Sequence, residues 1–74
     1  MRKPDYAIRS RLIEELTRLF PDHITMAHTL GLQVRQARDW WYQNCTPSAS
    51  NFAMLDKHGV NIYYVITGQV KPDV

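Results

Sequence analysis

The side chains best suited to chemistry lie in one short run, where glutamine, arginine and aspartate alternate over residues 33–39. An arginine guanidinium can donate two hydrogen bonds to guanine O6 and N7, and a glutamine amide can pair with adenine N6 and N7. Arg35 is the strongest candidate for such a contact, with Gln33 or Gln36 beside it. Val34 offers only an apolar contact, most simply with a thymine methyl group. The run therefore predicts a surface that reads base edges, provided that a helix presents it.

Other uses of the same side chains stay open. Arg35 has a phosphate clamp or a solvated charge as its alternative, and Arg38, one turn further along, reaches either a base or only the DNA backbone. Asp39 would repel phosphate, so it either accepts from a cytosine amino group or, as we prefer, neutralises a neighbouring arginine.

The run belongs to a segment, residues 22–47, whose pattern predicts two short helices joined by a tight turn. Gly31 stands where the first helix must stop, since a left-handed conformation is least costly for glycine. Ala37 and Trp40 follow it six and nine residues later and share one face of the second helix. With that face turned inward, the polar run faces outward. Such a helix-turn-helix commonly places its second helix in the major groove of DNA.

Local signals set the bounds of these two helices. Asp22 is a good N-cap for a helix over residues 23–30, whereas Gln33 is an imperfect cap for the second, expected over 34–43. Asn44 is expected to take the left-handed conformation that ends the second helix. Near the end of this helix, Trp41 and Tyr42 cannot both face inward. This predicts either exposed aromatic surface or an aromatic ring lying over the next helix.

An apolar stripe with helical spacing predicts a further helix over residues 6–20, ended by Pro21. Its opposite face is charged and predicts two i, i+4 ion pairs: Arg11–Glu15 and Glu14–Arg18.

Two helices are expected after the polar run. Ser48 caps the first of them, over residues 48–58. The closing segment GVNIYYVITG is rich in strand-forming residues, and an edge strand is the competing interpretation. We favour a helix over 61–67, because Asn61 can cap it, Gly68 can end it, and the sequence offers no partner strand.

Contacts to the DNA backbone are expected outside the base-reading run. His23 lies in the first turn of its helix, where free N–H groups and the helix dipole attract anions. Asn44 and Thr46 follow the second helix, and Arg2 and Lys3 form a short arm at the N-terminus. Each such contact would position the protein without specifying a sequence. For a lone histidine, a surface position without a ligand is the alternative.

Composition narrows the function classes. The chain has 74 residues, which suit one domain, and a net charge of only +2, which does not by itself indicate a nucleic-acid binder. A single cysteine excludes an intrachain disulfide, and no apolar run approaches the roughly 18–20 residues that span a bilayer. With no secretion signal either, the expected location is the cytoplasm.

Catalytic and metal-binding patterns are lacking. His23 and His28 are five residues apart, off a common helix face, and there is no CxxC pair. Nor is there a glycine-rich phosphate loop, a catalytic carboxylate pair or a nucleophile–base pattern. We therefore expect no metal, no cofactor, no small-molecule substrate and no enzymatic activity.

The spacing of apolar, glycine and proline residues over residues 8–68 resembles the lambda repressor-like family, in particular the N-terminal domain of phage CI-type repressors and the Cro proteins. The residues that carry the resemblance are Leu16, Phe20, Ala27, Leu30, Gly31, Leu32, Ala37, Trp40, Pro47, Gly59, Val60, Ile62, Tyr64, Val65, Ile66, Thr67 and Gly68. Some positions depart from the family pattern. Gln33 replaces a Ser or Thr cap, Ala37 is smaller than the usual Val or Ile, and Trp41 and Tyr42 stand at positions that are usually polar.

The resemblance implies a compact five-helix all-α domain over residues 1–68, with the helix-turn-helix at 22–44 and a flexible tail or linker at 69–74. It implies a sequence-specific transcriptional regulator of phage or prophage origin that binds a palindromic double-stranded operator as a homodimer, in the cytoplasm of a bacterial host and on its nucleoid. Relatives dimerise through the last helix, which makes four residues candidates for this contact, with core packing as the alternative: Ile62, Tyr63, Val65 and Ile66.

Two questions stay open. The rival function is a helix-turn-helix module that binds another regulator, as antirepressors and some antitoxins do; the modest net charge and the acidic Asp39 favour it. The chain is also consistent with a complete Cro-like protein or with part of a longer CI-type repressor.

Overall fold

A computed structural model describes residues 6–69 of the chain, and all regular structure in that range is helical. The helices are α1 (Tyr6–Leu19), α2 (His23–Leu30), α3 (Val34–Trp41), α4 (Ala49–Lys57) and α5 (Ile62–Thr67). The expected all-α fold with five helices is therefore confirmed. The strand-rich closing segment forms α5, so the helical interpretation of that segment is also confirmed.

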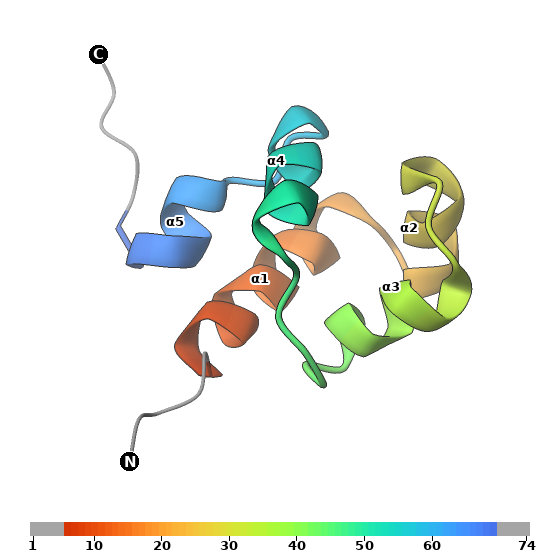
Figure 1. Cartoon of the computed structure of the whole chain (residues 1–74), viewed down its shortest axis with the longest axis horizontal. Helices are drawn as coiled ribbons and strands as arrows, with labels where there is room; N and C mark the ends of the chain where they lie inside the picture. The colour runs from red at the N-terminus through yellow and green to blue at the C-terminus, as the bar shows by residue number, and fades with distance from the viewer. Residues whose placement is uncertain (1–5, 70–74) are drawn as a thin grey trace.

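The helices form a compact unit in which α1 runs through the middle (Figure 1). One end of the molecule is built from α2 and α3, which pack against each other, and α5 lies at the other end. Helix α1 contacts both α3 and α5, and α4 packs against α5. Between them lies one core of fully buried side chains: Leu12, Leu16, Met26, Ala27, Ala37, Trp40, Leu55, Val60 and Val65.

Side-chain caps start three of the helices as expected. Asp22 accepts a hydrogen bond from the backbone N–H of Thr25 at 2.7 Å, and Ser48 accepts from that of Asn51 at 3.3 Å. Asn61 does the same for Tyr64 at 3.1 Å. Each cap satisfies an N–H group that the first turn of its helix leaves without an internal partner.

The end of α3 differs from the prediction. The helix stops at Trp41, two residues before the expected end, and the left-handed residue is Gln43 (φ 66°) rather than Asn44. Gln43 N–H donates to the carbonyl of Trp40, and Asn44 N–H donates to that of Asp39. This is the Schellman arrangement, in which the second residue after the helix must be left-handed. A helix ending at Trp41 places that requirement on Gln43.

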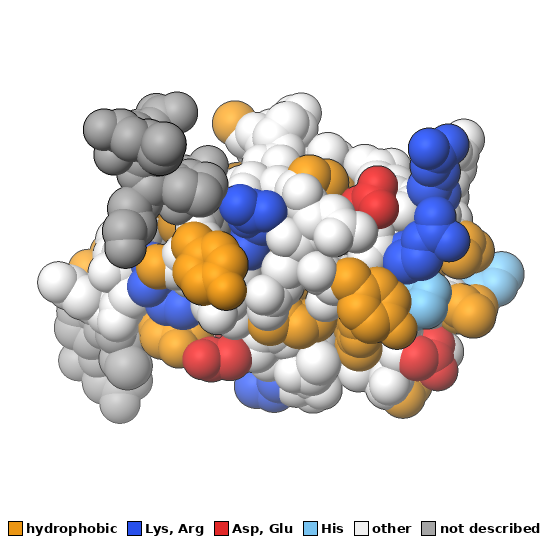
Figure 2. All heavy atoms as spheres, turned by 90° about the horizontal axis from the view of Figure 1, so that it is seen from below, with side chains coloured by type: hydrophobic (Ala, Val, Ile, Leu, Met, Phe, Trp, Pro, Cys, Tyr) orange, Lys and Arg blue, Asp and Glu red, His pale blue; other side chains and the backbone are white. Residues whose placement is uncertain are grey.

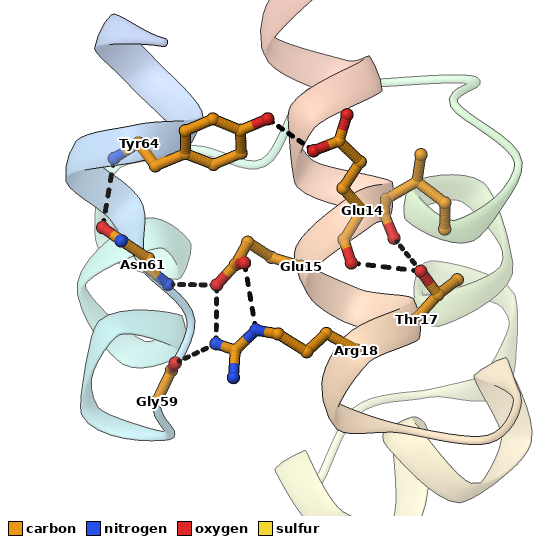
Figure 3. Close-up of polar contacts among 8 residues, drawn as sticks. Glu14, Glu15, Thr17, Arg18, Gly59, Asn61 and Tyr64 are labelled. Carbon is orange, nitrogen blue, oxygen red and sulfur yellow. Dashed lines mark hydrogen bonds and ion pairs between the residues drawn. The ribbon is translucent and has the colours of Figure 1, made fainter. Parts of the chain in front are cut away.

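The two ion pairs predicted along α1 are also wrong. Glu15 pairs instead with Arg18, three residues away, at 2.8 Å. Arg11 donates to two carbonyls at the end of α5, those of Val65 at 2.9 Å and Ile66 at 3.2 Å. The remaining carboxylate, on Glu14, accepts from the Tyr64 hydroxyl (Figure 3). The charged face of α1 therefore holds α5 in place.

No helix within residues 6–69 is long and apolar enough to span a membrane.

Candidate functional site

The candidate site is the end of the molecule where α3 lies against α2. Ala27 of α2 and Ala37 of α3 are at most 1% exposed. Small side chains at these positions let the two helices approach closely. Gly31 takes the left-handed conformation expected of it, with φ 71°. Its N–H and that of Leu32 both donate to the carbonyl of Ala27. These bonds fix the direction in which the chain leaves α2 and enters α3.

The outward face of α3 carries most of the residues predicted to read bases. Gln33, Val34, Arg35 and Arg38 are exposed, whereas Ala37 and Trp40 are buried. The other two, Gln36 and Asp39, are half-buried. Arginine and histidine side chains gather at the end of the molecule formed by α2 and α3, with acidic side chains beside them (Figure 2). Helix α3 thus presents a short polar and basic ridge to solvent.

Asp39 does not have the partner we preferred for it. Its carboxylate accepts from the Asn44 side-chain amide at 3.5 Å, the limit for a hydrogen bond. No arginine among the residues that the structure describes forms an ion pair with it. The turn after α3 brings Asn44 back toward the last turn of the helix, where its backbone N–H also bonds to the Asp39 carbonyl. The negative charge of Asp39 therefore remains on this surface.

The described residues that are predicted to contact phosphate lie at the start of α2 and in the connection after α3. His23, half-buried at the start of α2, lies 5.7 Å from the Tyr42 ring in an edge-to-face arrangement and 6.3 Å from the Trp41 ring, measured between ring centroids. This packing brings the start of α2 next to the end of α3. Asn44 is exposed and Thr46 half-buried on the connection that follows. The remaining two candidates, Arg2 and Lys3, lie outside the described residues.

The two aromatic residues at the end of α3 have different environments. Trp41 is half-buried and packs against the core, whereas the Tyr42 side chain is 60% exposed. Exposed aromatic surface is therefore present, but Tyr42 supplies most of it.

A carboxylate already occupies part of the helix end where phosphate is expected. The hydrogen bond from the Thr25 backbone N–H, followed by that from the Thr25 side chain, holds the pKa of Asp22 below its usual range. The charge of His23 acts in the same direction. Asp22 is therefore ionised at neutral pH, and an anion that approaches this end of α2 meets both a negative charge and the remaining free N–H groups.

The residues predicted for dimerisation divide between surface and core. Tyr63 and Ile66 are 42% and 48% exposed, and with Ile62 they line an open groove of about 460 Å³ between α5 and α4. Val65 is fully buried and packs in the core, so its assignment to a partner contact is wrong. The six-residue helix has one side turned toward α1, and Val65 lies on it. Across the groove α4 contributes Ala49, Phe52, Ala53 and Asp56.

Sequence reasoning missed one side chain that shapes the site, Arg9 of α1. Its Nη1 atom donates to the carbonyl of Gln43 at 2.8 Å, across a separation of 34 residues. No local pattern in the sequence signals a contact between residues so far apart along the chain.

Within residues 6–69, no three His, Cys, Asp or Glu side chains are grouped so as to hold a metal ion.

Comparisons of the chain with protein-family models, with curated proteins and with solved structures gave no match. The site must therefore be interpreted from its own residues.

Proposed function

We propose that this protein is a sequence-specific DNA-binding transcriptional regulator of the phage-repressor type, in which α2 and α3 act as a helix-turn-helix. The single observation that carries the proposal is the outward face of α3. The side chains exposed there can meet base edges: Gln33, Val34, Arg35 and Arg38. Two buried residues of α3, Ala37 and Trp40, fix the helix on its scaffold.

In this mechanism α3 enters the major groove with its N-terminal end leading. Arg35 donates two hydrogen bonds to a guanine, Gln33 pairs with an adenine, and Val34 packs against a thymine methyl group. Because Gln36 is half-buried, it contributes less than Gln33. The backbone is held by His23 and by the residues after α3, which position the protein without reading sequence.

A single short helix buries too little surface for strong binding at physiological salt, so we propose a homodimer on a palindromic operator with half-sites about one DNA turn apart. The partner contact is assigned to the exposed residues of α5, Tyr63 and Ile66, beside the apolar groove. In this arrangement the two subunits contact each other through their α5 ends. Helices α2 and α3, at the other end of each subunit, would face DNA (Figure 1).

The test is selection of bound sites from random DNA at defined salt, followed by affinity measurements on the selected site. Arg35→Ala should cost about 1–3 kcal/mol and relax the preference at one base pair. Lys57→Ala, which removes a positive charge from the last turn of α4, is the matched control and should change affinity much less. Binding of the wild-type chain should weaken steeply with salt.

The rival function, a helix-turn-helix module that binds another regulator, is favoured by the 60% exposed Tyr42 beside His23 and by the charge of Asp39 on the same end of the molecule. Undetectable DNA binding at low salt, together with loss of a protein complex in Tyr42→Ala, would decide for this rival.

A further inference from the structure

The turn after α3 is held from behind by α1. Arg9 is half-buried, and its Nη1 atom donates to the Gln43 carbonyl at 2.8 Å. The guanidinium of Arg9 is directed toward the backbone of the turn. Its positively charged group therefore interacts with a carbonyl group of the turn.

Two features of this turn cost free energy: a residue other than glycine in the left-handed conformation, and a buried donor without a partner. Gln43 has φ 66° and is the single non-glycine residue with positive φ among residues 6–69. The Nε atom of Arg9 is buried and has no hydrogen-bond partner. Strained backbone and unpaired buried donors persist only where surrounding contacts enforce them, and such costs concentrate at functional sites.

Contacts from two further elements fix the same turn. The Tyr42 ring packs edge-to-face on His23 of α2, with 5.7 Å between centroids. The backbone N–H of Asn44 donates to the Asp39 carbonyl of α3 at 2.8 Å. With the bond from Arg9, helices α1, α2 and α3 therefore all contact residues 42–44, a segment that includes the exposed side chain of Asn44.

We propose that Arg9 is a positioning residue for binding of the DNA backbone. Without touching DNA, its bond to the Gln43 carbonyl holds the turn so that two uncharged donors, the Asn44 amide and the Thr46 hydroxyl, meet phosphate oxygens. This inference rests on the proposed function, and it adds to it a residue of α1 that acts through the turn.

The experiment is a double-mutant cycle on the selected operator, with affinity measured at several salt concentrations. Arg9→Met keeps the aliphatic stem and removes the donors, whereas Asn44→Ala with Thr46→Ala removes the groups that Arg9 is proposed to position. We expect about a tenfold loss from Arg9→Met, with the slope of log affinity against log salt unchanged, because no charge in contact with phosphate is removed. The combined variant should bind no more weakly than the weaker of the two. Arg9→Lys, which keeps a donor, should recover most of the affinity.

Three results would overturn the inference. A fall of about 0.9 in the salt slope would mean that Arg9 touches phosphate itself. Additive losses in the cycle would mean that Arg9 and the turn act independently, and full affinity in a folded Arg9→Met protein would leave Arg9 a purely structural role. If Arg9→Met does not fold, as judged by urea unfolding, Arg9→Gln takes its place in the same cycle. Absence of salt-dependent binding by the wild-type protein would reject the proposed function as well, whereas additivity with normal wild-type binding rejects only this inference.

Discussion

Replacing Glu15 by glutamine should destabilise the fold far more than the same change at the neighbouring Glu14. Glu15 is only 9% exposed, and three N–H donors converge on its carboxylate (Figure 3). Arg18 donates from Nε at 3.1 Å and from Nη2 at 2.8 Å, and the backbone N–H of Asn61 donates at 2.8 Å. Arg18 also donates to the Gly59 carbonyl at 3.2 Å, so this carboxylate ties α1 to the chain that enters α5.

The size of the effect follows from these partners. A glutamine oxygen in the place of Oε1 can still accept from Arg18 Nη2 and from the Asn61 N–H, because it has two lone pairs. The amide NH₂ group that replaces Oε2 cannot accept from Arg18 Nε, so that hydrogen bond is lost and two donors face each other, at a cost of about 1 kcal/mol. Loss of the ion pair adds at most about 0.5 kcal/mol, because the Arg18 side chain is 55% exposed. We expect a total of about 1.5 kcal/mol, which lowers the melting temperature of a domain of this size by about 6–12 °C.

Glu14→Gln is the matched control. Glu14 is exposed and accepts from the Tyr64 hydroxyl, a bond that a glutamine oxygen can still accept, so its loss in stability should stay below about 0.5 kcal/mol. Both variants and the wild type would be unfolded in urea at pH 7 and followed by circular dichroism, with equal slopes required for comparison. Equal stabilities of the two variants would refute the view that buried convergence of donors, rather than negative charge on α1, makes Glu15 important.

Three other outcomes are expected. Hydrogen bonding to its neighbouring arginine lowers the pKa of Glu15 from the ordinary 4.5, so its stabilisation is complete above about pH 4.5 and is lost as pH falls below it; urea unfolding from pH 6 to 3 should show a steeper loss for the wild type than for Glu15→Gln, and parallel curves would contradict this. Gln43→Gly should raise the free energy of unfolding by about 0.5–1 kcal/mol, because it relieves a positive φ, whereas Asn44→Gly should not. Val65→Ala should cost about 2 kcal/mol of stability, whereas Ile66→Lys should leave stability within about 0.5 kcal/mol and weaken self-association in sedimentation experiments; a destabilised Ile66→Lys or an unchanged dimer would count against the assignment of α5.

The starts of the helices could be predicted because a cap is a local interaction. Asp22, Ser48 and Asn61 each accept a hydrogen bond from the N–H group three residues ahead, so the cap needs no contact from a distant part of the chain. Glycines that end helices follow the same logic, since the requirement for positive φ belongs to one residue.

The partners of the α1 charges could not be predicted in this way. Spacing along a helix suggests i, i+4 pairs, yet Arg11 bonds to carbonyls of α5 that lie 54 and 55 residues away. The last carbonyls of a helix lack internal partners, so a guanidinium placed there gains hydrogen bonds and a favourable interaction with the helix dipole. That gain exceeds the few tenths of a kcal/mol available from an exposed pair on α1, but it exists only once α5 has docked.

In the candidate site, too, the α3 face could be predicted from local periodicity, whereas the turn after it depends on a long-range contact. This difference has a consequence for DNA specificity. The outward direction of Gln33 to Arg35 follows from the burial of Ala37 and Trp40, a local periodicity that substitutions on the exposed face do not disturb. The turn at Gln43, in contrast, depends on Arg9 and therefore on how α1 is seated. Under the proposed function, substitutions on the α3 face should change which operator is bound while phosphate contacts persist. Changes in α1 should instead weaken binding to all operators alike, because they displace the turn without altering the residues that read the bases.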